Sequence, residues 1–307
     1  GNTAAGIKIR SEGRYSANVA SNFRDASGNT LDGNLIAGNT FAGVDLWYAS
    51  ANDIRNNTIA ANGGEGIAKR AYVWGNNGIH AKLYAKGDVT NNLIYANTGR
   101  GLLVEPGSGG VIRQNTFYQN GASGVETATH SSTCTLSCSE AWDTGDEPAA
   151  PANPGVTRNP TLTFRNNVAA NHSAGGLFGI NNAFTGYVNG TYTQTAFTIS
   201  SCINQAFYNN NTNLQNIVCV NTLPGDPNPQ YVNPAGGDGV LGWSVGNPLA
   251  YLDDNWHISH IASGQGSNSP LIDVGAATAA TEGMDLKSTR SDGVTDTGTV
   301  DVGYHYS

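Results

Sequence analysis

Charge is scarce in this 307-residue chain, because only 12% of its residues are Asp, Glu, Lys or Arg. The net charge of −8 and the lack of a basic cluster argue against nucleic acid and anionic membrane surfaces as partners. No window of 18 apolar residues occurs, so the sequence predicts no transmembrane helix. The Gly-x-Ser-x-Gly elbow, the P-loop and the dinucleotide-binding fingerprint are also missing. No standard enzyme motif therefore indicates a function.

Cysteine is also rare and occurs only four times, in two local pairs. This arrangement predicts the disulfides Cys134–Cys138 and Cys202–Cys219, and with them an oxidising, extracellular location. Metal binding is the alternative, but the spacing and the few nearby histidines disfavour it. We therefore expect no metal centre and no cofactor.

Asparagine, in contrast, is abundant and recurs with a period of about 23 residues. Each copy has Asn, an apolar residue two positions on, a second Asn three positions further, and an apolar residue five positions after that. A fixed period of this size is typical of a solenoid, and the short alternating apolar runs indicate β-strands. The copies are Asn34–Ile36–Asn39–Val44, Asn57–Ile59–Asn62–Ile67, Asn92–Ile94–Asn97–Leu102, Asn115–Phe117–Asn120–Val125 and, with one extra residue before its last position, Asn166–Val168–Asn171–Leu177.

The repeated asparagines are expected at the corners of the coils. A corner residue often has a positive φ, which Gly accepts freely and Asn better than most residues. In stacked coils about 4.8 Å apart, Asn side chains can hydrogen-bond each other as a ladder. We therefore predict a structural ladder formed by Asn34, Asn57, Asn92, Asn115, Asn39, Asn62, Asn97 and Asn120.

Two stretches carry a family resemblance. Repeats such as IRNNTIAANGGEGI and VTNNLIYANTGRGL resemble the right-handed parallel β-helix repeat family of the pectate-lyase-like superfamily. The tail from SPLIDVG to DVGYHYS resembles the closing segment of secreted bacterial members, which have an Asp-x-Gly-aromatic ending. The resemblance implies an all-β fold, a right-handed parallel β-helix (β-solenoid) with lateral loops. It implies no single function, because the superfamily includes lyases, hydrolases, epimerases, adhesins and inert spacers.

The repeat predicts one domain over residues 1–307. Insertions are expected at about residues 10–30, 68–88 and 128–160, and a segment at about 223–268 should cover the C-terminal side of the stack. The motif TVDVGYHYS at the C-terminus is expected to form the last strand. The first residues have the spacing of a coil already under way, so we expect either an upstream piece or a second copy of the chain at this end.

The insertion at 68–88 combines basic and aromatic residues, and a hairpin is expected in it. Aromatic rings can stack on sugars and cations can bind carboxylates, so a lateral ligand surface is one interpretation. An ordinary loop whose aromatics pack on the coils is the other. The residues of the expected surface are Trp47, Arg70, Tyr72, Trp74 and Tyr84.

Trp47, Arg70 and Glu105 have the same offset from the first Asn of their copies. If the coils stack in register, these three residues form a column that contains an Arg–Glu pair. If the chain is an enzyme, the expected catalytic residues are Lys69, Arg70, Lys82 and Glu105, with the lysines or the arginine as base.

The other acidic residues give weaker evidence for a catalytic or metal site. Asp45 and Glu126 share an offset but lie three coils apart, about 14 Å, beyond the range of a glycosidase pair. The spacing of Asp292, Asp296 and Asp301 would allow Ca²⁺, but nothing else in the sequence indicates it.

Catalytic signatures of two related groups are absent. Polygalacturonase-like members carry Asn-Thr-Asp and Gly-His-Gly motifs, and epimerase-like members a Tyr-Gly-x-Asp-Pro-His run, none of which occurs here.

The sequence therefore leaves two hypotheses. We favour an extracellular structural or assembly protein that stacks end to end into filaments or forms an adhesin-like rod. The alternative is a secreted lyase or glycoside hydrolase acting on an acidic polysaccharide.

Overall fold

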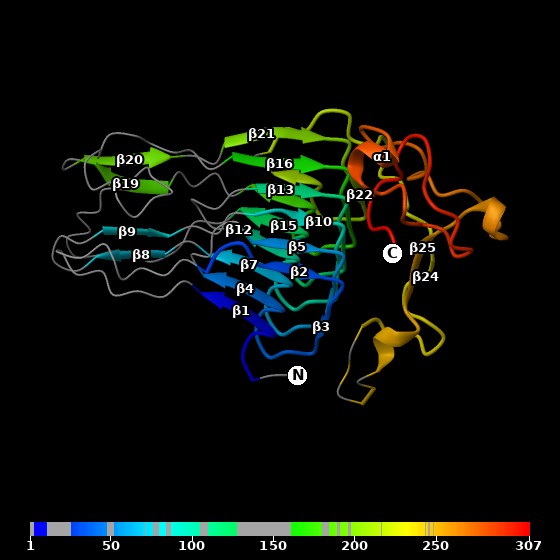
Figure 1. Cartoon of the computed structure of the whole chain (residues 1–307), viewed down its shortest axis with the longest axis horizontal. Helices are drawn as coiled ribbons and strands as arrows, with labels where there is room; N and C mark the ends of the chain where they lie inside the picture. Colours follow the sequence, from blue (N-terminus) through cyan, green and yellow to red (C-terminus); the bar gives the residue numbers. More distant parts are fainter. Residues whose placement is uncertain are drawn as a thin grey trace.

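Three parallel sheets wind around one axis in the computed structural model, with two lateral hairpins and a C-terminal segment outside them (Figure 1). This confirms the predicted parallel β-helix. The structure describes residues 3–10, 26–47, 52–70, 72–75, 80–83, 87–104, 110–127, 161–179, 184–188, 191–195, 198–215, 217–242, 244, 246–247 and 249–307.

Each coil contributes one strand to each sheet, and every neighbouring pair within the three sheets is parallel. Sheet 1 contains β1 (Ile7–Arg10), β4 (Val44–Trp47), β7 (Ile67–Arg70), β12 (Leu102–Val104), β15 (Val125–Thr127), β18 (Leu177–Gly179) and β23 (Leu214–Gln215). Sheet 2 contains β2 (Thr30–Asp32), β5 (Asp53–Arg55), β10 (Val89–Thr90), β13 (Gly110–Arg113), β16 (Thr161–Arg165) and β21 (Thr198–Ile203). Sheet 3 contains β3 (Leu35–Ala37), β6 (Thr58–Ala60), β11 (Leu93–Tyr95), β14 (Thr116–Tyr118), β17 (Val168–Ala170) and β22 (Ala206–Tyr208).

The core is a stack of apolar side chains that point into the coils. Because side chains alternate along a strand, each short strand places one or two residues inside. Burying one such side chain contributes about 1.5–3 kcal/mol. The inward column of sheet 3 consists of Ile36, Ile59, Ile94, Phe117, Ala169 and Phe207, and that of sheet 1 includes Val44, Ile67, Leu102, Val125 and Leu177.

The predicted asparagine ladders are present at two corners. Between sheets 2 and 3, Asn57 Nδ2 donates to Asn92 Oδ1 at 2.9 Å and to the Leu31 carbonyl of the preceding coil. Between sheets 3 and 1, Asn62 Nδ2 does the same with Asn97 Oδ1 and Ile36 O. All eight predicted residues take part in these two columns.

The conformational explanation for the ladder was wrong, however. The residues with positive φ immediately precede the ladder residues, for example Asn56 (φ 57°), Ala61 (φ 49°) and Asn91 (φ 53°). Ladder asparagines are therefore chosen for their side-chain amides, whereas the corner conformation falls on the residue before.

The fifth copy also needs correction by one residue. Asn167, not Asn166, continues the first ladder from Asn115, and His172 takes the place of the second Asn. With this register the copy has regular spacing, and its extra residue disappears. Gln205 and Asn210 extend the two ladders into a sixth coil.

Every insertion leaves the stack at one corner, between sheet 1 and sheet 2. The chain leaves after β1, β4, β7, β12, β15 and β18 and returns at β2, β5, β10, β13, β16 and β21. The predicted hairpin is confirmed as β8 (Tyr72–Gly75) and β9 (His80–Leu83), and a second, unpredicted hairpin consists of β19 (Phe184–Val188) and β20 (Thr191–Thr195). The insertion predicted from residue 68 begins only after Arg70, because residues 68–70 belong to β7.

The C-terminal segment packs along the flank of sheet 3, not over the end of the stack as predicted. Trp256 lies 4.6 Å from Tyr95 and 4.9 Å from Tyr118, between ring centroids. The segment contains β24 (Tyr231–Asn233), η2 (Ala250–Leu252), β25 (Asn255–Ile258), η3 (Ile261–Ser263) and α1 (Ala279–Glu282). In place of the expected last strand, residues 299–307 contain two isolated bridges, Thr299 with Thr278 and Tyr306 with Ser288.

Corner residues with positive φ hold this segment. Asn91 donates to the His305 carbonyl and accepts its N–H, at 2.8 and 2.7 Å. Asn166 accepts the Ala276 N–H, and Asn204 donates to Val274 O. The side chains just outside the ladders therefore bind the C-terminal segment across several coils.

One predicted disulfide, Cys202–Cys219, is present. Cys134 and Cys138 lie outside the described residues, as does the 128–160 insertion. Within the described ranges α1 is the one α-helix and has four residues, too few to cross a bilayer.

Replacing a buried ladder residue should destabilise the protein far more than replacing an exposed one. Asn97→Ala leaves the Asn62 N–H and the Ile59 carbonyl unpaired inside the stack, so we expect a loss of about 3 kcal/mol. Asn34→Ala, at the exposed end of the other ladder, should lose less than about 1 kcal/mol. Urea denaturation measures both, and equal losses would contradict the ladder as a source of stability.

Because His172 replaces an asparagine in the second ladder, we expect the protein to lose stability in acid. The Nδ1 of His172 accepts the Asn120 N–H, so the ring must be neutral, and burial lowers its pKa to about 4. Between pH 6.5 and 4 the unfolded chain binds more protons, so stability should fall on acidification by up to about 1.4 kcal/mol per pH unit. His172→Asn, which restores the regular ladder residue, should flatten this profile. Thermal melts from pH 4 to 7 test it, and parallel profiles would refute it.

Candidate functional site

The corner between sheets 1 and 2, which we call the insertion corner, is the candidate site. The other two corners are short and fixed by the ladders, and the hairpins β8–β9 and β19–β20 project from one side of the stack (Figure 1). Loops on a rigid scaffold are where binding and catalytic residues concentrate.

Four of the five residues predicted for a ligand surface have a described backbone, at this corner or just beyond it. Trp47 and Arg70 are the last residues of β4 and β7 and pair directly in sheet 1, as the register predicted. Tyr72 and Trp74 are on β8, and Lys82 is on β9 opposite Val73. For these residues the structure describes the backbone only. Tyr84 and Glu105 lie outside the described residues.

The prediction for Lys69 was wrong. Lys69 was expected as a base in an open site, but it is 0% exposed and lies among inward-facing residues, since Leu46 and Val104 are its register partners. Its Nζ donates to the Gly87 carbonyl at 2.7 Å. Burial lowers its pKa to about 8, partly offset by Asp88 and Asp53. Lys69 therefore holds Gly87, where the insertion rejoins the stack, by a hydrogen bond from within the core. It does not contact an external ligand.

Asp53 and Asp88 form an acidic column at the corner that sequence reasoning missed. Asp53 Oδ1 accepts the Asp88 N–H at 3.0 Å, and Asp88 Oδ1 accepts the Val111 N–H at 2.9 Å. The two residues are on adjacent coils, about 4.8 Å apart, close to the carboxylate separation of retaining glycosidases. Counting four residues back from Asn57 and Asn92 would have found them. Their plainest role is to pair backbone groups where the insertions return.

The column of Asp45 and Glu126 is confirmed in register through Ala68 and Leu103. Glu126 is 5% exposed and accepts from Arg100 at 2.7 Å. The two carboxylates thus lie three coils apart, as predicted, and do not form a catalytic pair.

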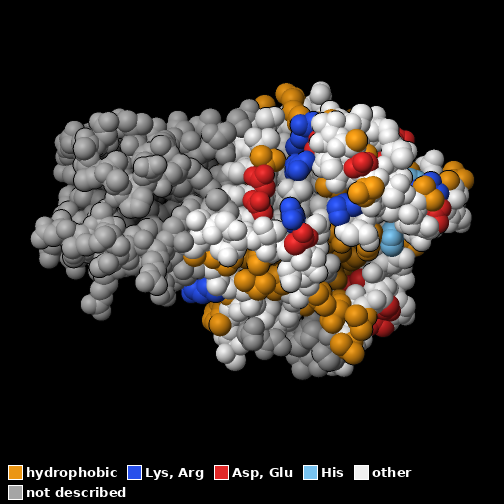
Figure 2. Space-filling model, in the orientation of Figure 1, with side chains coloured by type: hydrophobic (Ala, Val, Ile, Leu, Met, Phe, Trp, Pro, Cys, Tyr) orange, Lys and Arg blue, Asp and Glu red, His pale blue; other side chains and the backbone are white. Residues whose placement is uncertain are grey.

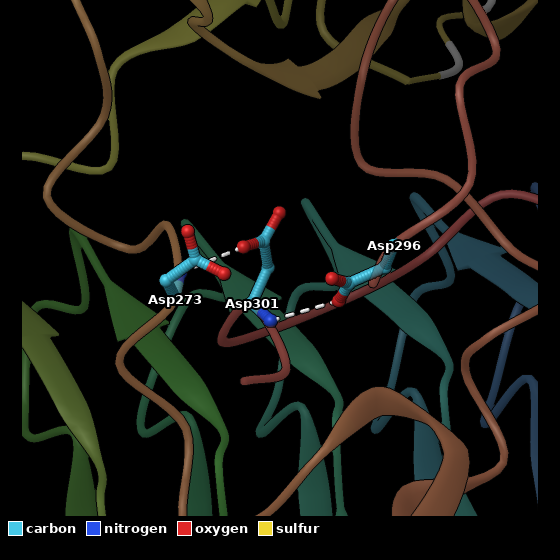
Figure 3. Close-up of side chains that lie close together, drawn as sticks. All are labelled: Asp273, Asp296 and Asp301. Atoms are coloured by element: carbon cyan, nitrogen blue, oxygen red, sulfur yellow. Dashed lines mark hydrogen bonds between the residues drawn. The ribbon is translucent and has the colours of Figure 1, made fainter. Parts of the chain in front are cut away.

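A second cluster lies in the C-terminal segment. The carboxylates of Asp273, Asp296 and Asp301 have oxygens within 4.8 Å of one another (Figure 3). Asp301 Oδ1 accepts the Asp273 N–H, and Asp296 Oδ2 accepts the Asp301 N–H, both at 2.8 Å. Sequence reasoning had grouped Asp292 with Asp296 and Asp301, but Asp292 pairs with Arg290 instead.

Histidine and threonine side chains complete this cluster. His305 Nε2 lies 2.9 Å from Asp296, the Thr289 hydroxyl donates to Asp301, and His260 Nε2 lies 3.6 Å from Asp301. Burial and the neighbouring Asp296 raise the pKa of Asp301. The cluster joins the SPLIDVG and DVGYHYS stretches, so we interpret it as the structural centre of the C-terminal segment.

Basic side chains gather over sheet 2 beside this segment (Figure 2). Arg113 and Arg165, neighbours in the register, both bind the buried carboxylate of Glu282 on α1, at 3.1 and 2.7 Å. Arg55 pairs with Asp32 at 2.9 Å. These arginines are engaged in holding α1 and the first coils, so this face is a weaker candidate than the insertion corner.

The buried Lys69 predicts an unusual alkaline response. The unfolded chain keeps a lysine pKa near 10.5, so between pH 8 and 10.5 it binds more protons than the folded state. Lys69 should therefore make stability rise with pH, by up to about 1.4 kcal/mol per pH unit. Lys69→Met should lack this contribution. The difference between the two proteins' melting temperatures from pH 7 to 10 measures it, and a constant difference would contradict it.

Comparison with solved structures finds only distant similarity. Among solved structures, the chain is similar to the periplasmic alginate epimerase AlgG, at 16% identity and a TM-score of 0.38, over 69% of this chain and 37% of that one. It is also similar to pectate lyase Pel9A, at 15% identity and a TM-score of 0.32, over 89% and 70%. The chain thus spans little more than a third of the epimerase it matches. No curated protein matches it.

A family assignment is clear. Residues 1–70 and 68–222 match the right-handed beta helix region. The same residues form the stacked coils, the amide ladders and the insertion corner. The chain therefore belongs to the right-handed β-helix family.

Proposed function

We propose that this protein is an extracellular β-helix that binds an acidic polysaccharide at the insertion corner and acts on it as a lyase or glycoside hydrolase. The observation that carries the proposal is that all insertions leave the stack at this one corner. Loops on a rigid scaffold are where binding and catalytic residues concentrate, so this side of the stack suits a binding site.

The chemistry of the corner suits a sugar polymer with carboxylates. Trp47 and Arg70 are adjacent in register, which combines a ring for stacking with a cation for a carboxylate. Coils repeat at about 4.8 Å, roughly the length of one monosaccharide, so equivalent positions of successive coils can meet successive sugars.

Two reaction types are compatible with this corner. Elimination needs a base beside the sugar, for which Arg70 and Lys82 are the remaining predicted candidates now that Lys69 is buried. Hydrolysis needs two nearby carboxylates, for which Asp53 and Asp88 are the described candidates.

End-to-end assembly into filaments or rods stays a prediction. It would use both ends of the stack, and at the C-terminal end the described chain pairs with its own last coil. For this reason we rank it below polysaccharide binding.

Removing one charge at the corner should weaken polysaccharide binding selectively. Arg70→Ala should lower affinity for polygalacturonate or alginate about tenfold, equivalent to about 1.4 kcal/mol. Trp47→Ala should act similarly through lost stacking. Isothermal calorimetry measures both effects, with dextran as the neutral polymer.

Arg55→Ala is the matched control, because it removes the same charge away from the corner. If it weakens binding as much as Arg70→Ala does, the attraction is non-specific and the proposal fails. Unsaturated products, detected by ultraviolet absorbance, would identify a lyase. New reducing ends without unsaturation, lost in Asp53→Asn, would identify a hydrolase.

A further inference from the structure

Residues 217–223, which we call the end cap, lie against the outer edge of β21 at the C-terminal end of the stack. Val220 N–H donates to the Cys202 carbonyl at 2.8 Å, and Val220 O accepts the Asn204 N–H at 3.2 Å. These bonds make a parallel bridge between Val220 and Ile203, the last residue of β21. The end cap therefore adds a short piece of strand to sheet 2.

A disulfide holds the end cap in place. Cys219 of the cap is bonded to Cys202 of β21, with a sequence separation of 17. Ile217 is 7% exposed and packs in the core, but Val218 is 86% exposed. The Leu223 N–H also donates to the Gln205 carbonyl, at 3.0 Å. The buried Ile217, three backbone hydrogen bonds and one covalent bond thus connect this short segment to the last coil.

The covered edge is one that could otherwise pair with another chain. β21 is one outer strand of sheet 2 and β2 is the other, and all strands between them are parallel. A second copy placed head to tail would therefore present β2 to β21 in the direction that continues the sheet. An open edge strand is a template for such pairing.

We propose that the end cap is a guard that blocks pairing of β21 with a second copy of this chain, and that the Cys202–Cys219 disulfide keeps the guard closed. A parallel arrangement of the partner's β2 needs the same Cys202 carbonyl and Asn204 N–H that Val220 occupies. The two states are therefore mutually exclusive, and the covalent bond favours the closed one by limiting how far the cap can move. While the disulfide and the Val220 bridge are intact, β21 does not pair with a second copy.

The double variant Cys202→Ala/Cys219→Ala tests the proposal. Amide hydrogen exchange at Asn204 and Val220 should become on the order of 100-fold faster in dilute solution, because the cap opens more often. Light scattering should then show association that grows with protein concentration, with renewed protection of Asn204 in the associated form. A reductant is less suitable, because the predicted Cys134–Cys138 disulfide would open as well.

Two further variants keep the test decisive if the double variant folds poorly. Val220→Pro removes the donor to Cys202 O but keeps the disulfide, and it should also allow association. Val218→Asp changes an exposed side chain of the closed cap and should leave the oxidised protein monomeric.

Three results would overturn the proposal that the end cap blocks pairing. The first is unchanged exchange at Asn204 and Val220 in the double variant. The second is faster exchange with no association at any concentration in either cap variant. The third is association of the oxidised wild type that Val218→Asp abolishes, because the closed cap would then itself be the contact.

Discussion

Side-chain amides that bond from coil to coil are the constraint on which this molecule depends. Each ladder asparagine satisfies the amide of its neighbour and a carbonyl of the preceding coil. Since these groups are buried, a coil that placed its asparagine one residue away would leave several of them unpaired. Two corners of every coil are therefore fixed in length and conformation, and only the third can change. The insertion corner is a direct result of the ladders.

The same logic explains how the outer parts attach. The residue before each ladder asparagine has positive φ, and its side chain points away from the ladder, so it is available to the C-terminal segment. Glu282 adds a charged contact by joining Arg113 and Arg165 of neighbouring coils. The segment covers the aromatic outer face of sheet 3, where Trp256 meets Tyr95. The surface of the stack thus has three parts. The two ladder corners are fixed, the outer face of sheet 3 is covered by the C-terminal segment, and the insertion corner is variable.

The sequence alone predicted the features that depend on the repeat period. A β-solenoid, both ladders, the pairing of Trp47 with Arg70 and one disulfide follow from spacing, and the family resemblance added the right-handed parallel β-helix. Sequence reasoning failed where a polar residue replaced Asn, as at His172, because the repeat was then aligned on Asn166 instead of Asn167. It also missed that the alternation of side chains along β7 turns Lys69 inward among core residues, which is rare for a lysine. The C-terminal segment could not be placed at all, because its contacts join residues more than a hundred positions apart.

The orientation of the ladder amides has one more consequence. In both columns the Nδ2 group donates toward the C-terminal end of the stack and the Oδ1 atom faces the N-terminal end. These dipoles all point the same way and add along the axis, much as peptide dipoles add along an α-helix. Each ladder therefore has a dipole along the axis, with its negative end toward the first coil and its positive end toward the last. An anionic chain that lies along the flank would meet a field that distinguishes its two ends.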